Sequence, residues 1–191
     1  MPEPMWLPAQ ALNCYEGDAQ LRSWLLTPGL LTQRIREAAG AGYRITLLGE
    51  YPDGEQHVRD IEMGCGAVAW MFARTRFPRA TTAAHPWLKH IGTTSLGEAL
   101  AAHGRVTRSE FDFARVYDGA LVEAARARAG LGPQPLWVRR STFAIDGAPL
   151  EVREAFLPAI GRDAAGQPLG DNRATTRRPA PAAACEKLRG P

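Results

Sequence analysis

Two charged side chains fall on faces of predicted strands that are otherwise apolar. Strict alternation puts Glu154 in the apolar row of residues 149–157 and Arg59 in the apolar row of residues 57–63. An ionised group on a buried face costs several kcal/mol unless it is paired or serves a site. An inward arginine and an inward glutamate on separate strands therefore indicate a small anionic ligand. The alternative is that the two simply pair with each other or reach a sheet edge.

Further arginines lie within apolar strand segments and could line the same cavity as Arg59. They are Arg74, Arg76, Arg139 and Arg140. The planar fork of arginine suits carboxylates. Several arginines with one carboxylate therefore indicate binding or rearrangement of a small organic acid.

The sequence lacks the motifs of several other kinds of site. It has no phosphate-binding loop, and its nearest approach to a dinucleotide fingerprint, residues 64–69, runs into a strand pattern instead of a helix. Its four histidines and three cysteines have no metal-ligand spacing. We therefore expect no nucleotide and no metal.

The elements that position these residues can be predicted from periodicity and turn signals. Two helices, from Asp18 to about Leu25 and from Leu30 to Ala39, flank Pro28-Gly29; they could read DNA, but the lack of a basic recognition face favours a packing layer. Strands are predicted at residues 43–50, 56–63, 67–77, 105–116, 136–145 and 149–157, and helices at 94–103 and 118–129, the last capped by Asp118. This order predicts an α+β fold, in which helices cover one face of an antiparallel sheet of about six strands.

Composition predicts one domain and a tail. The chain has 191 residues, of which 45% are hydrophobic, and the excess of basic residues lies entirely in residues 161–191. We expect residues 1–160 to form the globular domain and the Gly, Pro, Ala and Arg-rich residues 161–191 to be disordered, with a basic interaction arm as the alternative. The neutral body argues against a nucleic-acid partner. Without a signal peptide or a long apolar run, we expect a cytoplasmic monomer that does not insert into membranes.

Most of residues 12–160 resemble the chorismate pyruvate-lyase family. The similarity is carried by Leu21–Leu26, Leu31–Arg34, Arg59–Ile61, Ala73–Thr75 with Pro78, Thr94–Gly97, Thr107–Arg108, Leu136–Ser141 and Glu154–Pro158. The resemblance implies an enzyme that converts chorismate to 4-hydroxybenzoate and pyruvate for ubiquinone synthesis, without a cofactor and with product inhibition. Two alternatives are a binding domain of the same fold without chemistry, as in effector domains of bacterial transcription regulators, and an enzyme that makes a different benzoate.

The resemblance also implies roles for individual residues. Arg59 matches the arginine that binds the ligand carboxylate, here expected to be bidentate, and Glu154 matches the glutamate at the hydroxyl end of the product. Main-chain groups at Leu31 and Leu96 match two further ligand contacts. Chorismate has a second carboxylate, for which we expect Arg74, Arg139 or Arg140. The chain departs from the family in a shorter stretch before Arg59, an extra helix at 118–129 and the tail.

Overall fold

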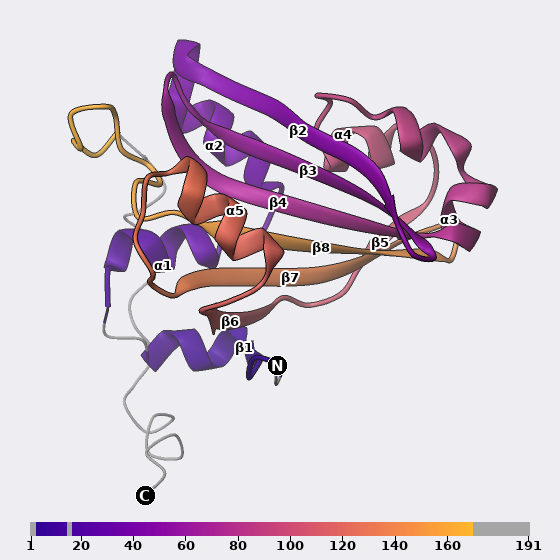
Figure 1. The fold of residues 1–191 in the computed structure, drawn as a ribbon, viewed down its shortest axis with the longest axis horizontal. Helices are drawn as coiled ribbons and strands as arrows, with labels where there is room; N and C mark the ends of the chain where they lie inside the picture. Colours follow the sequence, from indigo (N-terminus) through magenta and orange to yellow (C-terminus); the bar gives the residue numbers. More distant parts are fainter. Residues whose placement is uncertain (1–2, 15–16, 170–191) are drawn as a thin grey trace, which may run out of the picture.

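One antiparallel sheet forms the centre of the computed structural model, which describes residues 3–14 and 17–169 (Figure 1). In this part of the chain the sheet has eight strands in the order β1-β6-β7-β8-β4-β3-β2, with β5 also paired to β7. The strands are β1 (Leu7–Pro8), β2 (Tyr43–Asp53), β3 (Gln56–Cys65), β4 (Val68–Pro78), β5 (Val106–Arg108), β6 (Asp112–Val116), β7 (Leu136–Ile145) and β8 (Ala148–Phe156). The α+β fold and the antiparallel sheet are confirmed.

The prediction of about six strands was too low for two reasons. The single strand expected over residues 105–116 divides into β5 and β6, because Ser109 bonds to Thr142 through both its amide and its hydroxyl and interrupts the ladder. Each half then pairs with a different part of β7. The second reason is β1, a two-residue strand that pairs with β6 and has too short a pattern to be predicted.

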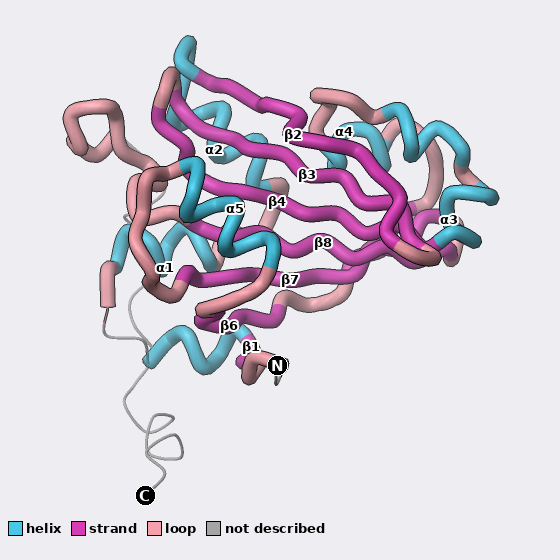
Figure 2. Tube along the Cα trace, in the orientation of Figure 1, coloured by secondary structure: helices cyan, strands magenta, loops and turns pink. Residues whose placement is uncertain are grey.

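Helices lie on both faces of the sheet, so the expectation that they cover one face was wrong. The described α-helices are α1 (Ala19–Leu25), α2 (Leu31–Ala39), α3 (Arg79–Ala84), α4 (Leu96–Ala101) and α5 (Ala120–Arg128), and the 3-10 helices are η1 (Ala9–Cys14), η2 (Gly40–Gly42) and η3 (Pro86–His90). In Figure 2, α5 crosses in front of the sheet while α1 and α2 lie behind it. The reason is that Phe72, Val138 and Ala155, which alternate with the site-facing residues, are apolar too and pack against α5.

The two N-terminal helices pack as the predicted layer over the sheet. Asp18 caps α1 by accepting the amides of Gln20 and Leu21, and α2 ends at Gly40, whose φ is 52°. Arg34 joins the helices, because its guanidinium lies 4.0 Å from the Trp24 ring and donates to the Ser23 carbonyl. The start of α5 differs from the prediction: its N-cap is Gly119, whose amide donates to Glu123, and not Asp118.

Residues 161–169 belong to the folded body and not to a disordered tail. The indole Nε1 of Trp70 donates to the Arg162 carbonyl at 2.8 Å, and Leu169 packs against the core behind the sheet. Residues 170–191, the remainder of the predicted tail, lie outside the described residues. Among the helices that the structure describes, none is long and apolar enough to cross a membrane.

Candidate active site

A cavity lies between the sheet and the helix layer that contains α2 and α4. It is lined by Leu30–Thr32, Arg59, Ile61, Met63, Ala73, Thr75, Leu96, Gly97, Arg108, Phe111, Arg139, Ser141, Phe143, Val152 and Glu154. The lining strand residues share one face because the register aligns Arg59 with Thr75 and Ala73 with Glu154. Since β3 and β8 flank β4, Arg59 and Glu154 are separated by about 10 Å across the sheet, at roughly 4.8 Å per strand.

Arg59 is a buried cation that is only partly occupied by the protein. Its Nη2 donates to the carbonyls of Gly92 at 2.7 Å and Thr94 at 2.8 Å, and its Nε lies 3.7 Å from Glu50 Oε1. Burial lowers the pKa of Arg59, and Glu50 opposes that shift. Within the described residues its Nη1 has no hydrogen-bond partner, so a ligand carboxylate would meet this nitrogen. The expected bidentate grip is not available, because the Nη2 hydrogens are already used.

Glu154 is held by a different arginine. Its Oε2 accepts from Arg139 Nε at 2.6 Å, and Arg139 is further fixed by the carbonyls of Leu25 and Thr27. In the part of the chain that the structure describes, Arg59 and Glu154 form no ion pair with each other. The two charges on apolar faces thus have separate partners and line one cavity.

Known proteins with similar sequences identify the family. The family described as chorismate lyase matches residues 50–164. A probable chorismate pyruvate-lyase of Thiobacillus denitrificans is 36% identical over 172 residues, covering 81% of this chain and 89% of that protein. The chain belongs to the chorismate lyase family. A probable chorismate pyruvate-lyase of Methylococcus capsulatus is 33% identical over 156 residues, covering 73% of this chain and 96% of that protein.

The family assignment confirms, at the level of the family, the expectation of a lyase that acts on chorismate. The fold is also found outside the family. The C-terminal domain of a histidine utilization repressor from Pseudomonas syringae pv. tomato superposes with a TM-score of 0.50 at 9% identity, covering 63% of this chain and 95% of that one. At this low identity the similarity concerns the fold alone.

Leu31 and Leu96 line the cavity, where the family resemblance expects main-chain ligand contacts. Leu31 begins α2 and Leu96 begins α4. The first amides of a helix have no carbonyl partner within it. Both positions therefore present backbone N–H groups that the helix itself does not use, which explains why backbone and not side-chain contacts are expected here.

Arg74 and Arg140 lie on the opposite face of the sheet and do not line the cavity. Arg74 bonds to Asp60 through Nε and Nη2, both at 2.8 Å, and this contact raises the pKa of Arg74. Arg140 pairs with Asp112 and stacks 4.1 Å from the Trp6 ring. Arg74 directly follows the cavity residue Ala73, and Arg140 directly follows Arg139. Because successive side chains of a strand point to opposite faces, both arginines point away from the cavity.

Arg108 lines the cavity, although the predicted set of site residues did not include it. It ends β5, and its guanidinium lies 4.4 Å from the Phe111 ring. The one available signal was its place in the Thr107-Arg108 pair of the family resemblance. Of the arginines expected for a second carboxylate, Arg139 is the one that reaches this cavity.

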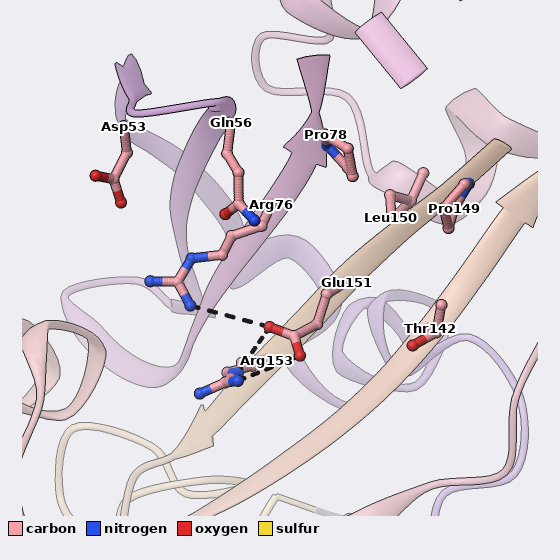
Figure 3. A pocket seen from close by; sticks show the side chains of 9 residues that line it. All are labelled: Asp53, Gln56, Arg76, Pro78, Thr142, Pro149, Leu150, Glu151 and Arg153. Carbon is pink, nitrogen blue, oxygen red and sulfur yellow. Dashed lines mark hydrogen bonds and ion pairs between the residues drawn. The ribbon is translucent and has the colours of Figure 1, made fainter. Parts of the chain in front are cut away.

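A wider hollow opens on the opposite face and serves as a comparison (Figure 3). Arg76, Glu151 and Arg153 line it, and Glu151 accepts from Arg153 at 2.8 Å with Arg76 at 4.0 Å. Its charges therefore compensate one another at the surface. The cavity next to α2 and α4, in contrast, presents buried charges that a ligand can contact, and we take it as the candidate active site.

Proposed function

We propose that the protein eliminates pyruvate from chorismate and releases 4-hydroxybenzoate, for use in ubiquinone synthesis. The observation that carries this proposal is that Arg59 and Glu154 line one cavity from strands on either side of β4, each held by a different partner. A flat aromatic acid can lie between them, with its carboxylate at Arg59 and its hydroxyl at Glu154.

The reaction needs little from the protein beyond binding and polarisation. Chorismate carries a carboxylate at C1, an enolpyruvyl ether at C3 and a hydroxyl at C4. The C3–O bond breaks with its electron pair on the departing oxygen, C4 loses its hydrogen as a proton, and the electrons of the C4–H bond complete the aromatic ring. Enolpyruvate takes up a proton and becomes pyruvate, so the atoms balance without water, oxidant or reductant.

The side chains of the cavity have complementary parts in this proposal. Arg59 Nη1 binds the ring carboxylate, and the second oxygen of Glu154 meets the C4 hydroxyl, because Arg139 already holds Oε2. The amides of Leu31 and Leu96 add main-chain contacts. The same helices exclude water and hold the flat product, so we expect slow product release and product inhibition.

One assay tests the function directly. Purified protein is incubated with chorismate alone, and 4-hydroxybenzoate and pyruvate are quantified by chromatography. We expect equal amounts of both. Binding of 4-hydroxybenzoate without turnover would instead favour a non-catalytic binding domain, and a different aromatic product would favour an enzyme that makes another benzoate.

Substitutions with matched controls test the two site residues. Arg59→Gln should weaken 4-hydroxybenzoate binding by about 10- to 100-fold, as expected for loss of a charged hydrogen bond. Glu154→Gln should lower kcat by roughly 10²- to 10⁴-fold if the carboxylate handles a proton. Arg74→Gln and Glu151→Gln, which change the opposite face, should leave both quantities within about twofold. Wild-type kinetics in a site variant would remove that residue from the proposal.

We further propose that the enzyme acts as a cytoplasmic monomer without a nucleic-acid partner. The support is the neutral body of residues 1–160 and the cavity, whose lining residues among those described come from this chain. Size-exclusion chromatography with light scattering should give the mass of one chain, 20.8 kDa.

A further inference from the structure

The cavity has a third arginine that the ring carboxylate and Glu154 leave unused. Arg108 donates from Nη2 to the Pro28 carbonyl at 2.7 Å and from Nη1 to the Gly29 carbonyl at 3.3 Å. Pro28 and Gly29 form the turn between α1 and α2 and immediately precede the cavity residues Leu30 and Leu31. The guanidinium is thus fixed at the rim where the turn meets the sheet.

The other two arginines of the cavity have fewer donors left for a second carboxylate, because Arg59 keeps only Nη1, which the ring carboxylate uses in the proposed function. Arg59 Nη2 donates to two carbonyls, and Arg139 is bonded to Glu154 and to two carbonyls of the α1 region. Arg108 differs, because among the described residues no carboxylate lies within ion-pair distance of it, whereas Arg59 has Glu50 and Arg139 has Glu154. A guanidinium has five N–H donors and these contacts use two. Three donors remain for a ligand.

The surroundings of Arg108 favour an incoming anion. Burial lowers the pKa of Arg108, the nearby Arg139 lowers it further, and Glu154 and Glu110 oppose the shift. Its guanidinium also lies over Phe111, at 4.4 Å, and near Phe143, at 5.8 Å from the ring centre. A partly desolvated cation beside a second cation gains more from a carboxylate than an exposed arginine does.

We propose that Arg108 binds the second carboxylate of the substrate, the one on its three-carbon ether side chain, and so gives the site its preference for dicarboxylates. This inference rests on the proposed function. The turn carbonyls orient the guanidinium before the substrate arrives, so little side-chain freedom is lost on binding. Charge that develops on the departing enolpyruvyl group is stabilised by the same cation. The product lacks this carboxylate and loses the contact.

The test compares two ligands that differ in the second carboxylate. Calorimetry measures binding of 4-hydroxybenzoate and of 3-(1-carboxyethoxy)-4-hydroxybenzoate, an unreactive aromatic with both acids. Wild type should prefer the dicarboxylate. Arg108→Gln should lose about 10- to 100-fold in dicarboxylate affinity and stay within about twofold for 4-hydroxybenzoate. The exposed neighbour Arg105→Gln is the matched control and should change neither affinity.

Other outcomes overturn the proposal. An unchanged dicarboxylate affinity in Arg108→Gln, or an equal loss for both ligands, would show that Arg108 does not recognise the second acid. Arg108→Met, which keeps an apolar stem against Phe111, repeats the measurement should the Gln variant fail to fold. Absence of turnover in wild type would sink the proposed function alone, because the binding comparison uses no reaction.

Discussion

Two fully buried arginines of this cavity have different roles at the scale of single residues. Arg59 and Arg139 are both 1% exposed. Arg139 is bonded to Glu154 and to two carbonyls, so it neutralises and orients a carboxylate of the protein. Arg59 retains Nη1, and its closest carboxylate, Glu50, lies 3.7 Å from Nε. Arg139 therefore belongs to the framework of the site, and Arg59 is the one of the two that can bind a ligand.

Replacing Arg139 should therefore affect stability first. Arg139→Met leaves the largely buried Glu154 without its cation, which costs about 3–5 kcal/mol when one partner of a buried pair is removed. Urea unfolding followed by circular dichroism measures this loss. The control is Arg140→Met, which changes the next residue of the strand. Because the Arg140 side chain is 27% exposed, its loss should lower the unfolding free energy by less than about 1 kcal/mol. Equal losses at the two positions would contradict the framework role.

Strand alternation alone could predict three of the four charged residues that line the cavity, Arg59, Arg139 and Glu154. Glu154 and Arg59 were found in this way. Alternation also places Arg139 and Arg140 on opposite faces of β7, so Arg140 could have been excluded from the cavity on the sequence alone. Arg108 could not be found, because the break at Ser109 that ends β5 depends on bonds to Thr142 in β7. A contact between residues far apart in the sequence, such as Ser109 and Thr142, produces no periodic pattern in the residues around it.

At the scale of elements, the two helices that close the cavity are joined directly. Arg36 of α2 donates to Glu98 of α4 from Nη1 at 2.7 Å and from Nη2 at 3.3 Å. In addition, a Cβ on Gly97 would collide with the side chain of Leu30 before α2. The first turns of α2 and α4 therefore lie in close contact above the sheet and hold Leu31 and Leu96 in place.

The Arg36–Glu98 pair predicts a pH dependence of stability. The hydrogen bond from Arg36 is the largest cause of the lowered pKa of Glu98 in the folded protein. A lowered folded pKa gives stability that is present above the unfolded pKa and lost as pH falls through the folded pKa. Because both side chains are over 40% exposed, we expect only about 0.5 kcal/mol at neutral pH.

Urea unfolding of wild type and Glu98→Gln between pH 3 and 7 measures this contribution. Their difference in unfolding free energy should shrink toward the acid end, as Glu98 takes up a proton and the pair with Arg36 is lost. Glu55→Gln, which alters an ion pair 3.7 Å long at the β2–β3 turn, is the control and should show a smaller difference. A constant difference from pH 3 to 7 would rule out the proposed linkage.

Elements with strong local signals were predicted and weak ones were missed. The β7–β8 hairpin follows from Asp146-Gly147, whose φ values of 49° and 86° fit the turn that such a pair favours. In contrast, α3 (Arg79–Ala84) and η3 (Pro86–His90) were not among the predicted elements. Their short length leaves no helical period, and tertiary packing of Leu88 and Thr81 stabilises them.

At the scale of the whole molecule, the sheet separates a ligand-binding layer from a supporting layer. On the supporting side Glu62 is 3% exposed and is held by Arg44 of β2 at 2.6 Å and Arg128 of α5 at 2.9 Å. Composition could not predict this second layer, since it depends on which strands become neighbours. The layer ties α5 to the face of the sheet opposite the cavity.

The folded body should extend to Leu169 and not end at Ile160. A chain cut after Ile160 loses the carbonyl of Arg162 that accepts from the buried Trp70, and also the packing of Leu169. An orphaned buried donor alone costs about 1–3 kcal/mol. Thermal melts of chains ending at Ile160 and Leu169 compare the two, and equal melting temperatures would restore the boundary at residue 160.

Ligand binding should stabilise the entire fold, because the proposed contacts come from β3, β8, α2 and α4 together. At 100 times its Kd, 4-hydroxybenzoate should add about 2.7 kcal/mol to the unfolding free energy. For a chain of this size that corresponds to a rise in Tm of roughly 5–10 °C, measurable by differential scanning fluorimetry. Arg59→Gln should reduce the rise at the same concentration, whereas Arg74→Gln, on the opposite face, should keep it. An equal rise in both variants would mean that the ligand binds outside the cavity.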